Sequence, residues 1–262
     1  MAHGYSIVQW TPYKRAFDLV LLLGVLVFMA AHVGASLALV GDQREPNLIQ
    51  LLIRAFGSGA FALLTLILMI GPLARLSRRF LPLLYNRRHM GVLCFALALI
   101  HALLVLVWYH GFGEINPLVS LLVSNPRYQS IAGFPFESLG LIGLMILLLM
   151  AATSHDFWNA LLGPLLWKGL HMSVYFAYAL IVAHIVLGAV QGEKGFIFAL
   201  VVSVGAALVT GLHLLAGARE ARGDRALAPE KQGWLNAGPA LEIEDGRARI
   251  LTPPEGEASD DA

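Results

Sequence analysis

Apolar and polar residues along this chain are arranged in long blocks rather than in short amphipathic periods. Six apolar segments stand out, at about 16–40, 48–74, 89–110, 138–154, 166–190 and 196–216. A helix needs about 20 apolar residues to cross a hydrocarbon layer of about 30 Å, and only the fourth segment is near the short limit. Because lipid offers no partners to backbone groups, each segment is predicted to be a helix. The expected fold class is all-α, an integral membrane bundle of six transmembrane helices.

The polar segments predict how the chain is oriented. Basic residues gather before the first, third and fifth segments and after the sixth, with five arginines between residues 75 and 88. The loops on the other side hold only Arg44, Arg127 and Lys194. Since basic loops stay on the cytoplasmic side, both termini are expected to be cytoplasmic, in the inner membrane of a cell. The first, third and fifth helices then run in the same direction.

The two ends of the chain are predicted to differ from the bundle. Residues 1–15 form a cytoplasmic segment, and the apolar run from Phe17 to about Val40 is too long for a signal peptide, so it is expected to be an uncleaved first span. Residues 16–216 form the bundle, and residues 217–262 form a polar tail. Alternation over 240–251 around Asp245 and Gly246 predicts a small hairpin within this tail.

Composition supports the membrane assignment and limits the chemistry. Hydrophobic residues make up 58% of the chain and charged residues 13%, about half the charged fraction of a soluble domain. The net charge of +1 averages loops on opposite sides of a membrane, and nucleic acid is not an expected partner. The single cysteine, Cys94, excludes a disulfide or a cysteine-ligated iron–sulfur cluster within these residues. We expect it to be a small buried apolar residue.

Nine histidines are the main chemical signal, and two of them differ from the rest. His101 and His184 lie deep in the third and fifth apolar segments, each the only strongly polar residue for about two turns. An ionisable side chain within a span is a functional candidate by default. Two imidazoles on facing helices suit bis-histidine ligation of a heme iron. A hydrogen bond shared between the two rings is the alternative.

A second level is suggested nearer the cytoplasm. His171 precedes His184 by 13 residues, about 20 Å along a helix. Arg87 and His89 precede His101 by a similar distance, so the lower pair would be His171 with either of them. At about 100° per residue, His171 and His184 point about 140° apart. A bulge or kink in the fifth helix is therefore needed.

The remaining histidines have simpler interpretations. Those at segment ends are expected to be interfacial polar residues, and those a turn or two inside a segment are expected to join helices by hydrogen bonds. The former are His110 and His155, and the latter are His32 and His213. No internal repeat is apparent, and intramembrane glycines such as Gly57 and Gly140 allow close approach of helices or of a macrocycle.

Residues 48–190 resemble the ferric-reductase-like transmembrane family. The stretches that carry the resemblance include 59–66, 71–73, 87–91, 139–141, 152–154 and 167–171, together with Tyr175 and the histidines of the third and fifth segments. The spacing His171-x12-His184 is the most specific part. The pattern is closest to the heme-binding membrane subunit of the bacterial methionine sulfoxide reductase system.

The resemblance implies b-type heme, one group or two, and one-electron transfer across the membrane. It assigns His101, His171 and His184 as iron ligands. NADPH oxidases of this family have a histidine where this chain has Arg87, so Arg87 and His89 compete for the fourth position. No flavin- or nucleotide-binding domain follows, so the expected donor is a separate reductase, an external flavin, a quinol or a partner subunit.

Two other functions remain open from the sequence. A quinol-oxidising cytochrome b that supplies a reductase on the other side of the membrane would use the same ligands. A heme-free transporter or scaffold belongs to another class and would have broken helices with a charged residue near the midplane. No Asp, Glu or Lys lies deep in any apolar segment, which disfavours a transporter.

Overall fold

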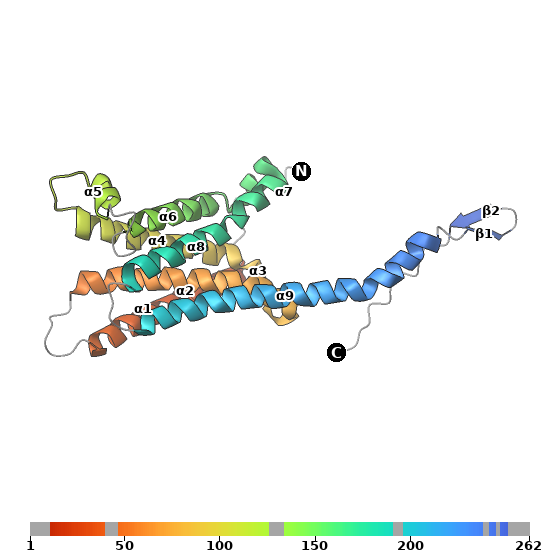
Figure 1. The fold of residues 1–262 in the computed structure, drawn as a ribbon, viewed down its shortest axis with the longest axis horizontal. Coiled ribbons are helices and arrows are strands. Elements are labelled where there is room, and N and C mark those ends of the chain that lie inside the picture. Colours follow the sequence, from red (N-terminus) through yellow and green to blue (C-terminus); the bar gives the residue numbers. More distant parts are fainter. Residues whose placement is uncertain are drawn as a thin grey trace. The chain divides into compact units, whose positions relative to one another are not determined.

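The computed structural model describes residues 11–39, 47–125, 134–190, 196–237, 241–244 and 247–250. The chain divides into two compact units, residues 1–213 and 214–262. The long elements of the first unit are helices (Figure 1). They are α1 (Pro12–Leu39), α2 (Leu48–Leu76), α4 (Arg87–His110), α6 (Phe136–Ala152), α7 (Asp156–Met172), α8 (Val174–Ile185) and the first part of α9 (Phe196–Ala237).

The six predicted apolar segments are all helical. Five helical spans are long and apolar enough to cross a membrane, and α6 is a shorter apolar helix, as the fourth segment predicted. Three short helices in the connections were not predicted, namely η1 (Arg78–Phe80), α3 (Leu81–Tyr85) and α5 (Pro117–Val123). Helix α9 ends at Ala237, well beyond the predicted boundary at 216.

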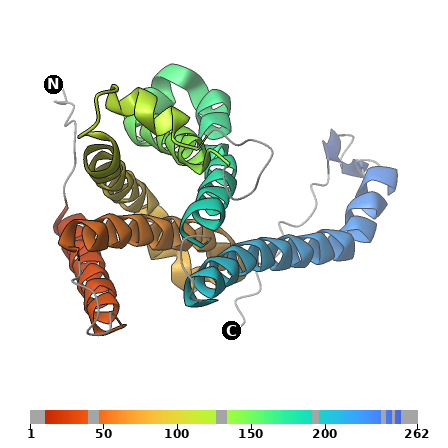
Figure 2. The same ribbon diagram turned by 60° about the vertical axis from the view of Figure 1, so that its left-hand side comes forward.

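Two helix pairs form the frame of the first unit. Helix α2 packs mainly on α4, and α6 packs mainly on α8. The pair α6 and α8 runs side by side in both ribbon views (Figures 1 and 2). Helices α4 and α6 contact each other, so they join the two pairs, and α1 contacts α2.

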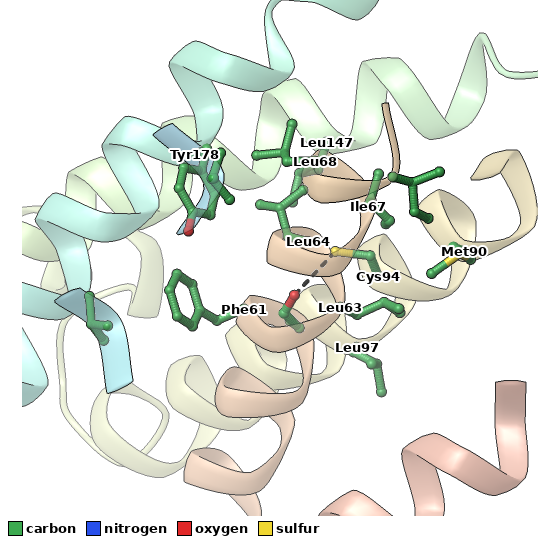
Figure 3. Packing of buried hydrophobic residues seen from close by; sticks show 14 residues of the cluster. Phe61, Leu63, Leu64, Ile67, Leu68, Met90, Cys94, Leu97, Leu147 and Tyr178 are labelled. Carbon is green, nitrogen blue, oxygen red and sulfur yellow. Dashed lines mark hydrogen bonds between the residues drawn. The ribbon is translucent and has the colours of Figure 1, made fainter. Parts of the chain in front are cut away.

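Helix α2 is the most buried span and supplies most of the core. Asn47 caps its N-terminus by accepting hydrogen bonds from the backbone N–H groups of Ile49 and Gln50. The core contains side chains from five helices. Figure 3 labels Phe61, Leu63, Leu64, Ile67 and Leu68 from α2, Met90, Cys94 and Leu97 from α4, Leu147 from α6 and Tyr178 from α8. Val202 and Val209 from α9 also belong to it.

Three buried polar side chains of this core, those of Cys94, Thr65 and Tyr178, have partners. The Cys94 thiol lies 3.4 Å from the Ala60 carbonyl, which confirms its expected role as a buried small residue. The Thr65 hydroxyl donates to the Phe61 carbonyl at 2.8 Å and lies 3.2 Å from the hydroxyl of Tyr178. This contact joins α2 to α8 in the middle of the bundle.

The fifth predicted helix is not continuous. It is interrupted at Ser173, between α7 and α8, and Val186–Val190 widen into a π-helical turn after His184. The kink or bulge that the angle between His171 and His184 required is therefore present. A further kink occurs within α7 at Gly163, where φ is 76°.

The second unit contains the end of α9 and a two-stranded antiparallel sheet. Strands β1 (Leu241–Glu244) and β2 (Arg247–Ile250) pair in the register Leu241 with Ile250 and Glu244 with Arg247. The predicted hairpin is confirmed, although its central residues Asp245 and Gly246 lie outside the described residues.

Candidate functional site

His101 of α4 is held by the backbone of α2. Its Nδ1 atom lies 2.8 Å from the carbonyl oxygen of Ile53. A carbonyl can only accept, so Nδ1 carries the hydrogen and Nε2 keeps its lone pair. Gly57 lies one turn further along α2, and a Cβ atom there would stand 2.9 Å from Nδ1 of His101.

His184 of α8 is held by α6 in the same way. Its Nδ1 atom lies 2.8 Å from the carbonyl oxygen of Phe136, so this nitrogen is also the donor. Gly140 lies one turn further along α6, and a Cβ atom there would stand 2.8 Å from Nδ1 of His184. Both imidazoles therefore have the tautomer that leaves Nε2 available as a ligand.

These two arrangements are structurally equivalent. In each, the imidazole donates a hydrogen bond to the carbonyl of a residue 48 positions earlier in the chain. The glycine that the imidazole contacts lies four residues after that carbonyl, on the same helix. Each member of the second set lies 83 residues after its counterpart, at positions 53 and 136, 57 and 140, and 101 and 184. The helix pair α2 and α4 is thus matched by α6 and α8 around the candidate site, although no repeat is apparent in the sequence.

The two imidazoles lie close to each other inside the bundle. Their ring centroids are 6.5 Å apart and their planes are inclined by 81°. With metal–nitrogen bonds of about 2.0 Å and ring nitrogens roughly 1.2 Å from their centroids, two imidazoles on opposite sides of one metal have centroids roughly 6.4 Å apart. The observed separation fits axial ligation of one iron. It is too large for the direct hydrogen bond that the sequence left as an alternative.

The chemistry of the donor set favours a metal that brings most of its own ligands. Within the described ranges, no group of three or more His, Cys, Asp or Glu side chains is arranged to hold a bare metal ion. Two axial imidazoles suit a metal whose four other positions are filled by a macrocycle. The residues present therefore fit heme.

His171 lies near the end of α7 in an aromatic and basic environment. Its Nδ1 atom donates to the Trp167 carbonyl at 2.9 Å, which again leaves Nε2 as the acceptor. The Trp167 ring stacks on His171 with centroids 3.9 Å apart, and its Nε1 donates to the Thr153 carbonyl at 2.9 Å. The Arg88 guanidinium lies over the Trp167 ring, 5.5 Å from its centroid.

The two candidates for the fourth position lie in different surroundings. His89 contacts α1, where its Nδ1 lies 2.7 and 3.0 Å from the two carboxylate oxygens of Asp18. A Cβ atom on Gly71 of α2 would stand 3.8 Å from the Arg87 guanidinium. The structure thus places the Arg87 side chain against α2 and the His89 ring against α1.

The remaining described histidines have local partners or lie at helix ends. His213 of α9 donates from Nδ1 to the Val209 carbonyl and accepts at Nε2 from the Tyr175 hydroxyl, at 2.8 and 3.0 Å. This is the helix–helix hydrogen bond expected of an intramembrane histidine without a ligand role. His110 contacts the Ser120 hydroxyl at 3.0 Å, and His155 caps α7.

Several supporting groups were not identified from the sequence. Asp18 carries no pattern that marks it as a partner of His89. The carbonyls of Ile53 and Phe136 have no signal in residue type, because every residue carries a carbonyl. The only sequence signal for these carbonyls was a glycine four residues later in each helix, and from the sequence these glycines were attributed to close packing.

Comparisons with known proteins find one matching family and several relatives. The family described as "Ferric reductase like transmembrane component" matches residues 56–182. Three curated relatives carry the name protein-methionine-sulfoxide reductase heme-binding subunit MsrQ. The one from Caulobacter vibrioides is 35% identical over 139 residues, 53% of this chain and 60% of the relative. The one from Herminiimonas arsenicoxydans is 29% identical over 189 residues, 70% of this chain and 82% of the relative.

The third relative, from Azospira oryzae, is 30% identical over 176 residues, which cover 67% of this chain and 68% of the relative. The match to the Caulobacter protein thus spans less than two thirds of that relative's length. No solved structure matches the chain. Its long apolar helices and the match to a transmembrane component show that the chain is an integral multi-pass membrane protein.

Proposed function

Because the chain belongs to the ferric-reductase-like transmembrane family, we propose that it binds b-type heme and moves electrons one at a time across the cytoplasmic membrane. It acts as the membrane subunit of an oxidoreductase, with both termini in the cytoplasm. The observation that carries this proposal is the pair His101 and His184, whose rings are 6.5 Å apart with both Nδ1 atoms satisfied by carbonyls.

His101 and His184 hold the first heme through Nε2. Bound heme iron supplies reversible one-electron chemistry between its ferric and ferrous forms. The protein holds each imidazole in one tautomer, and the surrounding apolar helices keep water away from the metal. With His101 and His184 both as ligands, the iron would have no open position for oxygen or substrate, which suits electron transfer.

His171 holds a second heme nearer the cytoplasm. Its Nδ1 is satisfied by the Trp167 carbonyl, so Nε2 is again the ligand atom. Arg87 is the proposed partner on α4, because the contact with Asp18 directs the His89 ring toward α1. The Arg88 guanidinium beside Trp167 would neutralise a carboxylate group of this heme.

Donor and acceptor are separate molecules. We propose that electrons enter on the cytoplasmic side from a reductase, an external flavin or a quinol. The relatives are named as subunits of a protein-methionine-sulfoxide reductase, so the proposed acceptor is a partner protein of that activity on the other side of the membrane.

Heme stoichiometry tests this proposal. Pyridine-hemochrome analysis of the purified wild-type chain is expected to give two b-type hemes per chain, and His101→Ala and His184→Ala are each expected to lose one. His213→Ala is the matched control, because this intramembrane imidazole already accepts a hydrogen bond at Nε2. Wild-type protein that takes up no heme under any condition contradicts the proposal and would favour a heme-free transporter or scaffold.

A further inference from the structure

We propose that Gly57 and Gly140 are positioning residues for the two axial imidazoles. Each opens the backbone carbonyl one turn earlier, that of Ile53 or Phe136, to the Nδ1–H group of the ligand histidine. The resulting hydrogen bond fixes the tautomer and the plane of the ring. This inference rests on the proposed heme function of His101 and His184.

The side chains of a helix cover the outward faces of its own backbone carbonyls. In an α-helix the carbonyl of residue i accepts from the N–H of residue i+4, and its second lone pair faces outward. Each Cβ is tilted toward the helix N-terminus, so the side chain at i+4 covers that lone pair. A glycine at i+4 removes the cover and leaves the carbonyl open to a second donor.

The measured distances show that the glycines are needed. At Gly57 a Cβ would stand 2.9 Å from Nδ1 and 3.0 Å from Cε1 of His101. At Gly140 a Cβ would stand 2.8 Å from Nδ1 and 2.9 Å from Cε1 of His184. Carbon and nitrogen atoms that are not bonded to each other prefer separations of about 3.5 Å or more, so an alanine at either position must push the imidazole away.

The same arrangement occurs twice, on different helices. Residues 53, 57 and 101 correspond to residues 136, 140 and 184, with equal hydrogen-bond distances of 2.8 Å. A fortuitous close approach would not be expected to place glycine, carbonyl and histidine at the same spacings in both helix pairs. The recurrence points to a common requirement, which is the control of the ligand ring.

Two effects on the ligand follow from this hydrogen bond. Donation from Nδ1–H to a carbonyl raises the basicity of Nε2, which stabilises the ferric state and lowers the reduction potential. The bond also prevents rotation of the ring about its metal axis, so it maintains the inclination of 81° between the two planes. Loss of either bond should raise the potential and release the ring.

The first experiment compares Gly57→Ala and Gly140→Ala with Gly59→Ala in full-length, heme-loaded protein. Gly59 is the matched control on α2, since a Cβ there meets Leu97 at an ordinary distance of 3.8 Å. The measurements are the midpoint potential and the low-spin electron paramagnetic resonance spectrum. The two test variants are expected to raise the potential of one heme and alter its spectrum, whereas Gly59→Ala leaves both unchanged.

The main comparison of a second experiment does not involve the alanine variants. In His101→Gly, the missing ligand is replaced by imidazole, by 4-methylimidazole, which keeps an N–H group, or by 1-methylimidazole, which lacks it. Ligands with the N–H group are expected to bind about threefold to tenfold more tightly, as one hydrogen bond provides. Adding Gly57→Ala to His101→Gly should abolish this preference.

The possible results distinguish a failure of the glycine proposal from a failure of the proposed heme function. Wild-type protein without low-spin heme overturns the proposed function, and the inference fails with it. Wild-type protein with low-spin heme whose potential and spectrum are unchanged by Gly57→Ala and Gly140→Ala overturns the inference alone. Equal affinity for imidazole, 4-methylimidazole and 1-methylimidazole in His101→Gly also overturns the inference alone.

Discussion

At the scale of single residues, burial of a polar ring explains why the two histidines could be predicted from the sequence. His101 and His184 were identifiable because a neutral imidazole among apolar residues must find a partner. The structure shows that one nitrogen of each ring has a carbonyl partner, which lowers the cost of burial and leaves the other nitrogen for a ligand. The partner carbonyls could not be predicted, because their positions depend on which helices are neighbours.

The assignment of the second ligand pair makes a prediction about Arg87 and His89. Arg87→Ala is expected to remove or strongly perturb the heme held by His171, because Arg87 is the proposed second ligand of that heme. His89→Ala should leave heme content unchanged, because the contact with Asp18 directs its ring toward α1. Hemochrome stoichiometry and the midpoint potentials of both hemes check this. Loss of a heme in His89→Ala with normal content in Arg87→Ala would reverse the assignment.

The buried pair Thr65 and Tyr178 predicts a stability effect without a heme effect. Tyr178→Phe removes one buried hydroxyl but keeps the ring that stacks on Phe61 with centroids 5.8 Å apart. The expected loss is about 1 kcal/mol of stability, because Thr65 still donates to the Phe61 carbonyl. Thermal unfolding in detergent measures the loss, and heme absorbance is expected to stay constant. A variant as stable as the wild type would show that this hydrogen bond contributes nothing.

At the scale of elements, helical periodicity predicted that the fifth span is interrupted but not where. The angle between His171 and His184 required an interruption, and the structure places it at Ser173. Serine has no strong tendency to break a helix, so the sequence did not indicate this position. The length of α9 was underestimated because polar residues mark the end of a membrane span and not the end of a helix.

Gly163 within α7 is expected to be sensitive to substitution because of its backbone conformation, although there is room for a side chain. Its φ of 76° with ψ of 159° is essentially restricted to glycine, although a Cβ there would meet nothing within 4 Å. Gly163→Ala is expected to destabilise the protein by about 1–3 kcal/mol. Gly169→Ala, in the same helix and with equally open space, is the control and should be neutral or slightly stabilising. Equal unfolding temperatures for the two variants would be inconsistent with the kink.

At the scale of the whole molecule, composition and basic residues predicted an all-helical membrane bundle, and the long helices agree. The equivalence of the two helix pairs was not predictable, because only the glycine and the histidine are the same residue in both halves, and the third group is a backbone carbonyl. Side-chain identity differs at the carbonyl positions, Ile53 and Phe136. Sequence comparison within the chain therefore has little to detect.

The proposed orientation predicts the results of reporter fusions. A reporter that is active only in the cytoplasm should function when fused after Ala237, and one that is active only outside should function when fused after Phe112. The reason is the concentration of basic residues on the side of the N-terminus, the loop at 75–88 and the C-terminal part of α9. The opposite pattern of activity would invert the topology and the direction of electron flow.

The central claim is that His101 and His184 share one heme iron. Electron paramagnetic resonance of the oxidised protein tests it most directly, because nearly perpendicular imidazole planes give a strongly anisotropic low-spin signal with a large highest g value. We predict this signal in the wild-type protein and its disappearance in both His101→Ala and His184→Ala, with His213→Ala unchanged. A strongly anisotropic signal that persists unchanged in either of the first two variants would contradict the claim.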